Sequence, residues 1–574
     1  MVADATDGVL ESARAWLAQD PDAVTRHELA ALIDQASGTG EGSVTPEAAA
    51  GALAELHSRF DTRLEFGTAG LRGEIGAGSN RMNRVLVAQA AAGLAAYLLE
   101  KAQPGVTPSV VIGYDGRTNS DVFARDSAEI MAGAGVRAIL LPRLLPTPVL
   151  AFAVRHFDVS AGVMVTASHN PPRDNGYKVY LGGAHQGSQI VAPADGEIAA
   201  HILRFAAERS VLDAPRRTDY QVATDEVVDS YIIATVADVP RPEAQVSSVY
   251  TAMHGVGWET AQRVFQNAGF DAPACVAEQI APDAAFPTVA FPNPEEPGAM
   301  DLAFARAREV GAEIVIANDP DADRLAVAIP SAGPGSEGGW RRLSGNEVGY
   351  LLGWQAAEHA RAAGIGGTLV CTIVSSPALR AVAGDYGLDF VETLTGFKWV
   401  SRVPGILYGY EEALGYLVNP GTVRDKDGIS AALAFLSLAS ELKTRGSTIA
   451  DRLDEFTARF GHFASDQISI RVTDLADIAR VMALLRESPP TKIGGVPVER
   501  IDDLLGGFGD LAPSDVLRIR LADGSRVMVR PSGTEPKLKI YIDASSTEGS
   551  VAERRASATG RVSALAEGMT LLIG

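Results

Sequence analysis

Residues 108–141 read PSVVIGYDGRTNSDVFARDSAEIMAGAGVRAILL, and this stretch decides the fold class. The run from Pro108 to Asp115 is apolar and ends in a polar loop. Residues 121–132 have the spacing of a helix, and the run from Val136 to Leu141 is apolar again. This order predicts a strand, a helix and a second strand. Strand, loop and helix are predicted in the same order at 246–270, 311–329 and 368–390. Short apolar runs separated by helices predict parallel strand pairs in α/β layers.

The two ends of the chain differ from this pattern. Residues 1–60 are rich in alanine with helical spacing, which predicts a helical extension. Residues 466–472 and 516–530 alternate between polar and apolar side chains, the second stretch around an Asp-Gly pair, so we expect antiparallel strands and a final α+β domain. The predicted domains are 1–60, 61–220, 221–335, 336–455 and 456–574.

Size and composition limit the classes of function. At about 100–200 residues per domain, 574 residues predict three to five domains. The net charge of −21 argues against general binding to nucleic acid or an anionic membrane. An anionic substrate would therefore need a local cluster of Lys and Arg. The two cysteines, Cys275 and Cys371, exclude a disulfide framework. Because the chain starts without secretory features and has no apolar run of about 20 residues, we expect a cytoplasmic protein.

The sequence Thr-Ala-Ser-His-Asn-Pro-Pro at 166–172 offers an exposed hydroxyl, Ser168, at the end of an apolar run. The same residues are also typical of a simple turn. The flanks lack the Gly-x-Ser-x-Gly elbow of a hydrolase. Neighbours on an extended segment point apart, so His169 is expected to orient the loop or contact phosphate rather than to activate Ser168.

The sequence Asp-Pro-Asp-Ala-Asp-Arg at 319–324 lies between two apolar runs. In an extended segment Asp319, Asp321 and Asp323 point the same way and converge on one hard cation. A solvated acidic turn is the alternative, but carboxylates this close repel one another unless a cation lies among them. Oxygen ligands favour Mg²⁺ over Zn²⁺. Arg324 either binds phosphate or forms a surface ion pair. A serine that can carry phosphate and a magnesium loop together predict phosphoryl transfer.

Two further segments suggest substrate binding. Residues 409–416 place Glu411 and Glu412 in a glycine-bracketed loop, where carboxylates can accept hydrogen bonds from sugar hydroxyls, although such pairs also occur in solvated turns. Residues 530–537 combine a guanidinium, hydroxyls and an open glycine backbone, which predicts an anion nest; the alternative is a β-turn. The predicted phosphate ligands in this nest are Arg530, Ser532, Gly533 and Thr534.

These four motifs, in this order, resemble those of the α-D-phosphohexomutases, the phosphoglucomutase/phosphomannomutase family. The resemblance covers roughly residues 60–545. Segments 250–257, 291–298 and 397–399 look most like the phosphoglucomutase-2 branch. The resemblance implies four domains around a central cleft: three related α/β domains with mixed sheets, and a C-terminal α+β domain with an antiparallel sheet. It also implies interconversion of hexose 1-phosphate and hexose 6-phosphate, of glucose and/or mannose, through a 1,6-bisphosphate that also serves as activator.

The resemblance assigns expected roles to single residues. Ser168 would carry the phosphate, and with the three aspartates it would hold one Mg²⁺ per chain. Lys178 and Lys426 match lysines proposed for general acid/base catalysis, and either would need a depressed pKa to act as a base at neutral pH. The remaining expected site residues are Arg72 and His169 in catalysis, and Glu411, Glu412, Lys398, Arg324 and the Arg530 loop in substrate binding.

One departure leaves the sugar open. Many members have a hydroxyl after the carboxylate of the sugar loop, whereas this chain has Ala413 and Leu414. A phosphopentomutase and a sugar-bisphosphate synthase therefore stay open within the family. A metal-dependent sugar phosphatase and a silent sugar-phosphate-binding protein stay open as different classes of function. The expected partners are small sugar phosphates, and the sequence leaves the oligomeric state open between monomer and dimer.

Overall fold

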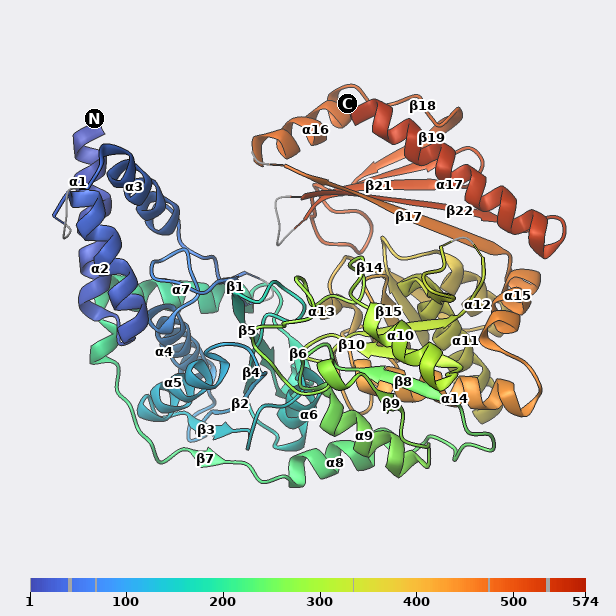
Figure 1. Ribbon diagram of the computed structural model, residues 1–574, viewed down its shortest axis with the longest axis horizontal. Helices are drawn as coiled ribbons and strands as arrows, with labels where there is room; N and C mark the ends of the chain where they lie inside the picture. Colours follow the sequence, from blue (N-terminus) through green and yellow to red (C-terminus); the bar gives the residue numbers. More distant parts are fainter. Residues whose placement is uncertain are drawn as a thin grey trace. The chain divides into compact units, whose positions relative to one another are not determined.

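The computed structural model describes residues 2–39, 44–67, 70–333, 335–472, 475–532 and 537–573 (Figure 1). The chain forms two compact units. The first comprises Met1–Arg241, Ser247–Trp340 and Gly421–Leu433, and the second Pro242–Val246, Arg341–Pro420 and Ala434–Gly574.

Three helices precede the first sheet, as predicted for residues 1–60: α1 (Val2–Gln19), α2 (Ala23–Ser37) and α3 (Pro46–Phe60). The side chains of Asp22 and Thr45 cap the backbone at the starts of α2 and α3. Apolar side chains of these helices belong to the same core as the first sheet. The buried Arg59 donates to Glu28 at 2.8 Å and to the Ala77 carbonyl at 3.2 Å, so the extension is tied to the loop before α4.

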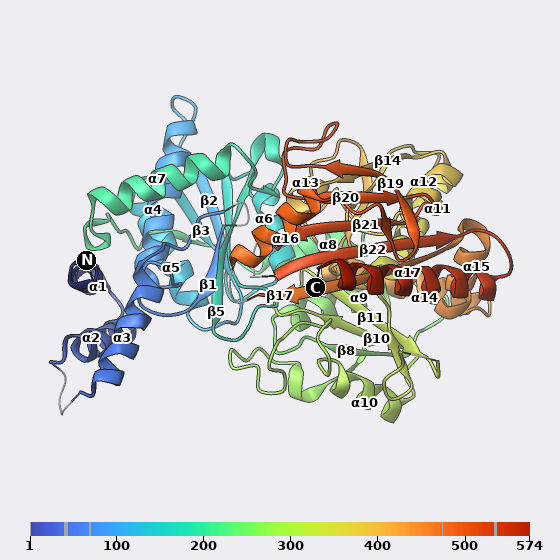
Figure 2. The ribbon, with the colours of Figure 1, turned by 90° about the horizontal axis from the view of Figure 1, so that it is seen from above.

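The first sheet is mixed and has the order β1-β5-β4-β2-β3-β7, with β6 beside β5. Strands β2, β3, β4 and β7 pair in parallel, whereas β1, β5 and β6 pair antiparallel. Helices α4 and α5 cover one face and α6 covers the other (Figure 2). The strand, helix and strand predicted within residues 108–141 are confirmed as β2, α5 and β3. The strands are β1 (Leu71–Glu74), β2 (Ser109–Tyr114), β3 (Arg137–Leu140), β4 (Ala161–Val165), β5 (Asp174–Leu181), β6 (Ser188–Gln189) and β7 (Gln221–Val222), and the helices are α4 (Arg84–Lys101), α5 (Ser120–Gly133), α6 (Thr147–His156) and α7 (Ala194–Glu208).

The second sheet has the order β12-β11-β10-β8-β9. Its strands are β8 (Ser248–Thr251), β9 (Ala274–Cys275), β10 (Ile314–Asn318), β11 (Leu325–Pro330) and β12 (Trp340–Arg342), with helices α8 (Glu226–Val236), α9 (Gly257–Ala268) and α10 (Asp301–Val310). The prediction of strand, loop and helix at 311–329 is wrong, because this segment is a pair of antiparallel strands, β10 and β11. The intervening loop is too short for a helix and turns back at Ala322, whose amide donates to the Asp319 carbonyl at 2.8 Å.

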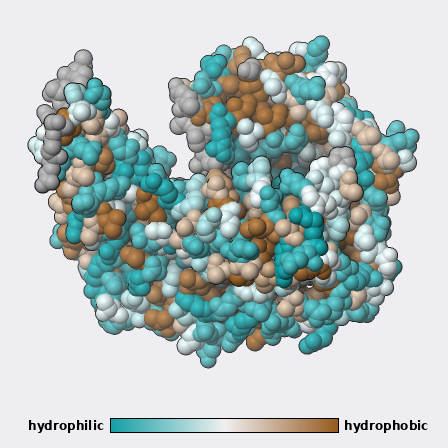
Figure 3. All heavy atoms as spheres, in the orientation of Figure 1, coloured by the Kyte–Doolittle hydropathy of each residue, from teal (hydrophilic) through white to brown (hydrophobic). Residues whose placement is uncertain are grey.

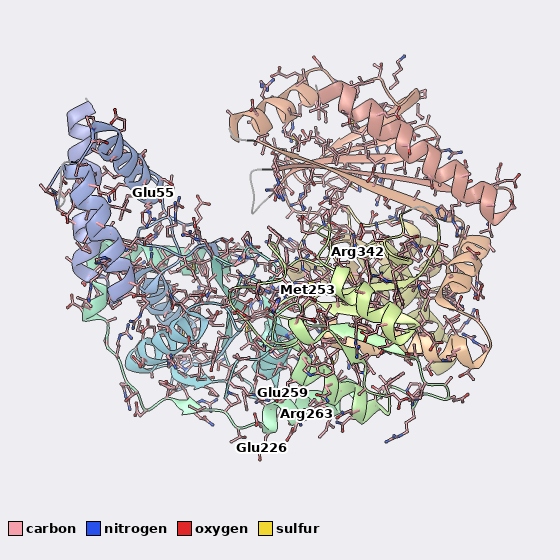
Figure 4. All side chains as sticks on the ribbon, viewed as in Figure 1. Glu55, Glu226, Met253, Glu259, Arg263 and Arg342 are labelled. Atoms are coloured by element: carbon pink, nitrogen blue, oxygen red, sulfur yellow. The ribbon has the colours of Figure 1, made fainter. Side chains whose placement is uncertain are left out.

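Surface ion pairs join the two sheets of the first unit. Arg143, in the loop after β3, contacts Asp225 before α8 and Glu259 on α9. Arg263, one turn further along α9, contacts Asp229 on α8. Figure 4 shows Glu259 and Arg263 together on the side of α9 that faces α8. These ion pairs are surface contacts between segments that flank the two sheets.

The second unit contains a mixed sheet and an antiparallel sheet. The mixed sheet has the order β14-β13-β15-β16, and the antiparallel sheet β17-β22-β21-β20-β19-β18. The predicted Asp-Gly turn is confirmed between β20 and β21, where Gly524 has a φ of 82°. The strands are β13 (Thr368–Thr372), β14 (Asp389–Thr393), β15 (Ile406–Glu411), β16 (Gly415–Leu417), β17 (His462–Arg471), β18 (Lys492–Ile493), β19 (Val496–Asp503), β20 (Leu517–Leu521), β21 (Arg526–Pro531) and β22 (Lys537–Ser546). The helices are α11 (Gly345–Ala363), α12 (Ala378–Tyr386), α13 (Phe397–Val400), α15 (Ile449–Phe460), α16 (Leu475–Glu487) and α17 (Val551–Ile573), while α14 (Gly428–Thr444) has residues in both units.

Three mixed sheets followed by one antiparallel sheet confirm the predicted fold class. The predicted domain boundaries stay a prediction. The face displayed in Figure 3 is mostly hydrophilic, with smaller apolar areas between the polar ones. Among the described residues, no helix has the length and apolar character needed to cross a membrane.

Candidate active site

Ser168 lies three residues after β4, in the loop that follows the strand. Its backbone is left-handed, with a φ of 50°, and its amide donates to the hydroxyl of Thr166 at 2.8 Å. The expectation of an exposed hydroxyl is wrong, because Ser168 is only 2% exposed. The left-handed turn directs the side chain inward, where Oγ donates to Asp319 Oδ2 at 2.6 Å. The two sequence motifs therefore meet directly, although 151 residues separate them.

The loop that carries Ser168 is held by Arg117, a residue that the sequence analysis missed. Its guanidinium donates to four backbone carbonyls, those of Ser168 (2.6 Å), Asn170 (2.6 Å), Pro171 (2.8 Å) and Asp174 (3.0 Å). A signal was present in the sequence, since Arg117 follows strand β2, which pairs in parallel with β4. Loops at the carboxyl ends of neighbouring parallel strands meet at one edge of the sheet.

His169 contradicts the geometric expectation made for it. Its Nδ1 lies 3.2 Å from Ser168 Oγ, because the left-handed backbone at Ser168 replaces the extended geometry in which neighbouring side chains diverge. Burial lowers the pKa of His169 well below its usual value, and the cations Arg324 and Arg72 lower it further. These effects favour the neutral imidazole, and its Nδ1 lies within hydrogen-bond distance of the serine hydroxyl.

The three aspartates converge, but not along an extended strand as expected. Ala322 between them has a φ of 55°, and the resulting turn brings one oxygen of each carboxylate within 4.8 Å of the others. Asp319 Oδ1 accepts the Arg324 amide at 2.9 Å. Asp321 Oδ2 accepts the hydroxyl of Thr147, a further residue that sequence reasoning missed, at 2.6 Å.

The carboxylate cluster fits a hard cation. Asp321 Oδ1 and Asp323 Oδ1 are buried, and neither accepts a hydrogen bond from any residue in the described part of the chain. Buried carboxylate oxygens that lack donors are the ligands expected around Mg²⁺. Burial and the neighbouring Asp323 raise the pKa of Asp321 above its usual value, so positive charge nearby favours its ionised form.

Two lysines supply part of that charge. Lys178 Nζ, on β5, lies 2.7 Å from Asp321 Oδ2 and 2.8 Å from Asp323 Oδ2. Lys426 Nζ lies 3.3 Å from Asp323 Oδ2. Burial opposes ionisation of Asp323, yet Lys178, Lys426 and Arg324 hold its pKa below the usual range. Burial alone would lower the pKa of Lys178, but Asp321 and Asp323 raise it above its usual value. The two carboxylates beside it therefore favour the protonated form of Lys178 rather than the depressed pKa that a base would need.

Lys426 is itself held by a buried carboxylate. Asp425 Oδ1 lies 3.5 Å from Lys426 Nζ, and Asp425 Oδ2 accepts from the Tyr180 hydroxyl at 2.9 Å and from the Gln189 amide at 2.8 Å. The predicted Arg72 lies in β1 and donates to the side chain of Asn170, in the loop that follows Ser168, at 3.2 Å. The nine residues Ser168, His169, Asp319, Asp321, Asp323, Lys178, Lys426, Arg324 and Arg72 thus all lie in the first unit.

Two glycines, Gly255 and Gly428, pack closely against the backbone of the aspartate loop. A Cβ on Gly255 would lie 2.3 Å from Pro320, and a Cβ on Gly428 would lie 2.2 Å from the Arg324 carbonyl. Gly255 follows Met253 and His254, which both have positive φ, and Met253 is labelled in Figure 4. Only glycine fits at either contact without displacing the loop.

The predicted sugar loop lies in the second unit. Glu411 ends β15, and Glu412 follows it. Glu412 Oε2 accepts the hydroxyls of Ser375 (2.9 Å) and Thr372 (3.2 Å), and the Glu412 amide donates to Ser375 Oγ at 3.1 Å. The carboxylate is therefore held in one orientation before any substrate binds.

The other predicted binding residues of the second unit lie in helix α13 and at the end of strand β21. Lys398 lies in α13, with its Nζ 5.4 Å from the Trp399 ring centre. Arg530 lies near the end of β21, and the Ser532 amide donates to the Lys537 carbonyl at 2.7 Å. The predicted ligands Gly533 and Thr534 lie outside the described residues.

Comparison with known proteins agrees with this arrangement. Models of the phosphoglucomutase/phosphomannomutase family match the chain in order: alpha/beta/alpha domain I at 63–208, domain II at 229–333, domain III at 344–460 and the C-terminal domain at 468–558. The chain belongs to the phosphoglucomutase/phosphomannomutase family. Its members are mutases that transfer a phosphoryl group within their substrate, so the chain is an enzyme of this class.

Relatives in this family differ in the sugar that their names give. The probable phosphomannomutase of Haemophilus influenzae is 56% identical over 473 residues, which are 82% of this chain and 95% of that protein. The phosphopentomutase of Mus musculus is 36% identical and covers 92% of this chain and 89% of that protein. A crystal structure of a putative phosphomannomutase from Thermus thermophilus has the same fold, with a TM-score of 0.67 at 24% identity, over 89% of this chain and 99% of that one.

Proposed function

We propose that this chain interconverts hexose 1-phosphate and hexose 6-phosphate, of glucose and/or mannose, through a phosphoserine at Ser168 and a hexose 1,6-bisphosphate. The observation that carries the proposal is the contact between Ser168 Oγ and Asp319, inside a cluster of three aspartates and two lysines. The relative that is 56% identical, a probable phosphomannomutase, supports a hexose as the substrate.

The reaction consists of two phosphoryl transfers. In the first, a hydroxyl oxygen of the hexose monophosphate attacks the phosphorus of phosphoserine, the bond from phosphorus to Ser168 Oγ breaks, the hydroxyl proton leaves to a base, and the leaving Oγ takes up a proton. In the second, Ser168 Oγ loses its proton and attacks the phosphorus of the other phosphate, the bond from that phosphorus to the sugar oxygen breaks, and the sugar oxygen takes up a proton. Asp319 Oδ2, at 2.6 Å, and His169 Nδ1, at 3.2 Å, are the acceptors that we assign to that proton.

The charges around Ser168 suit this transfer. A Mg²⁺ ion held by Asp319, Asp321 and Asp323 would neutralise negative charge on the phosphoryl group. Because Asp321 and Asp323 favour the protonated form of Lys178, we assign it electrostatic stabilisation or proton donation to the leaving oxygen. We assign Lys426 and Arg324, which both lie beside Asp323, to the positive charge around the cluster. We assign Arg72 to holding the loop after Ser168, through its hydrogen bond to Asn170.

The second unit is proposed to hold the part of the substrate that does not react. Glu412, with Glu411 and Lys398, would bind sugar hydroxyls. Arg530 and Ser532, with Gly533 and Thr534 outside the described residues, would bind the non-reacting phosphate. The proposal further includes one Mg²⁺ per chain, a hexose 1,6-bisphosphate activator, a cytoplasmic location and the four predicted domains after residue 60. The ranges matched by the family models support these boundaries.

A pentose 1-phosphate is the second candidate substrate. The mouse phosphopentomutase supports it, as does the sugar loop, in which Ala413 and Leu414 provide no hydroxyl to a hexose. The experiment that decides is a coupled assay with glucose 1-phosphate, mannose 1-phosphate and ribose 1-phosphate, each with the matching bisphosphate. We expect hexose turnover that Ser168→Ala abolishes. A tenfold preference for ribose, about 1.4 kcal/mol in transition-state binding, would overturn the hexose assignment. Release of inorganic phosphate without isomer formation would identify a phosphatase.

A further inference from the structure

The carboxylate of Glu412 is oriented by a chain of buried groups that begins in the C-terminal sheet. Thr372 and Ser375, both fully buried, lie 2.9 Å apart by their hydroxyl oxygens, and both contact Glu412 Oε2. Two hydroxyls on one oxygen fix the plane of the carboxylate and direct the other oxygen, Oε1, away from them. Glu412 can therefore present Oε1 to a ligand in a fixed direction.

The loop that carries Ser375 is in turn held by Arg526, on β21. One guanidinium nitrogen, Nη2, donates to the Ser375 carbonyl. The others contact Asp543 Oδ2 at 2.8 Å through Nε and Glu392 Oε1 at 3.2 Å through Nη1. Arg526 is 7% exposed, and Asp543 is fixed from its other side by the hydroxyl of Ser465 at 2.6 Å. A buried, planar guanidinium with three acceptors allows little freedom to the carbonyl that it binds.

An apolar cluster surrounds this contact. It joins residues that follow β13 and β14 with residues in or beside strands β19 to β22: Ile373, Val374, Leu394, Leu504, Val516, Met528 and Tyr541. Ile373 and Val374 directly precede Ser375, and Met528 lies two residues after Arg526. The segment 372–376 is therefore fixed by burial as well as by hydrogen bonds.

We propose that Arg526, Ser375 and Thr372 are positioning residues for sugar recognition, and that they couple the C-terminal sheet to the orientation of Glu412. The inference rests on the proposed function, in which Glu412 binds a sugar hydroxyl. Because Arg526 and the predicted phosphate ligand Arg530 share strand β21, the groups that bind sugar and phosphate are held by one continuous element.

The test compares Arg526→Met, Ser375→Ala and their double variant in the full chain. Each single change should raise the KM for glucose 1-phosphate about tenfold, the scale of one lost hydrogen bond to a charged group, and should alter the ratio of kcat/KM between glucose and mannose 1-phosphates. The double variant should lose no more than about threefold beyond the larger single effect, since both changes act on one loop. Arg526→Lys, which keeps a donor, should recover part of the loss.

The matched control is Arg518→Met. Arg518 lies on the neighbouring strand β20 and contacts Asp502 at 3.0 Å and Glu392 at 3.9 Å, but it does not contact Ser375. This variant should lower the melting temperature as Arg526→Met does, yet keep KM within about twofold. Loss of stability without a change in KM for Arg526→Met, or fully additive effects in the double variant, would overturn the inference. Should Arg526→Met fail to fold, Thr372→Val removes one hydroxyl from the same chain with little change in shape.

Failure of the proposed function gives a different result. If the wild-type protein converts neither glucose 1-phosphate nor mannose 1-phosphate, that function fails. Calorimetric binding of glucose 1-phosphate to the same variants then tests the positioning role alone. A tenfold weaker Kd for Arg526→Met than for Arg518→Met would still support the role, and equal Kd values would refute it.

Discussion

Replacement of Arg117 by methionine tests whether the loop that carries Ser168 needs the hydrogen bonds from this guanidinium. The guanidinium donates to four carbonyls of residues 168–174 and lies 3.7 Å from Asp115, with both side chains 1% exposed. Methionine retains the apolar volume but leaves those carbonyls without this donor and the buried Asp115 carboxylate without the neighbouring positive charge. Removing one partner of such a buried network costs about 3–5 kcal/mol.

Part of that free energy should appear as loss of order in the loop rather than as global unfolding. A loop displaced by about 1 Å places Ser168 Oγ outside its contact with Asp319, so kcat should fall about 100-fold, equivalent to about 2.7 kcal/mol. The assay is the steady-state conversion of glucose 1-phosphate, with the melting temperature and the phosphate content of Ser168 measured on the same samples.

The matched control is Arg84→Met. Arg84 binds Asp126 through two nitrogens at 2.7 and 2.9 Å in the same unit, and it does not contact the Ser168 loop. This variant should lose stability and keep kcat within about threefold. The reasoning is refuted if Arg117→Met retains kcat within threefold of the wild type, or if both variants lose activity in proportion to their loss of stability.

Three further predictions concern other parts of the first unit. Removal of divalent cations with a chelator should abolish turnover, Mg²⁺ should restore it, and Asp321→Asn should need at least tenfold more Mg²⁺ for half-maximal activity; equal requirements in titrations of both proteins would contradict the metal site. Gly255→Ala should destabilise the fold by about 1–3 kcal/mol in denaturant unfolding and lower kcat, because its Cβ meets the backbone of the aspartate loop at 2.3 Å; unchanged stability would contradict the close approach. Burial opposes ionisation of Asp126, but Arg84 and Arg216 hold its pKa below the usual value, so its stabilising effect is complete above the unfolded pKa of about 3.9 and is lost as the pH falls below it. The difference in melting temperature between the wild type and Asp126→Asn should therefore shrink from pH 6 to pH 3, and a constant difference would count against this ion pair.

The sequence predicts the layers of this protein better than its loops. Strand and helix spacing in residues 108–141, and the alternation after residue 460, have the periodicities that the sheets require. The error at 311–329 arose because two apolar runs with a short aspartate-rich segment between them fit a hairpin as well as a strand before a helix. Only the left-handed turn at Ala322, which depends on tertiary contacts, decides between them.

In the candidate site, too, the residue types could be predicted from the sequence, whereas the loop conformations could not. The motifs identified Ser168 and the three aspartates by residue type, but alternation along a strand gave the wrong reason for their convergence. The burial of Ser168 and its contact with His169 follow from the positive φ of Ser168. A serine in the sequence does not predict this backbone conformation. Thr147 and Asp425 act through hydrogen bonds to groups distant in sequence, and such contacts become visible only in the folded chain.

The most direct test of the account follows one phosphate through one turnover. Enzyme carrying ³²P on Ser168 is mixed with unlabelled glucose 1-phosphate and quenched after a single turnover. The account predicts the label on the 6-phosphate of the hexose, with one unlabelled phosphate on Ser168. Label released as inorganic phosphate, with Ser168 left unmodified, would contradict it.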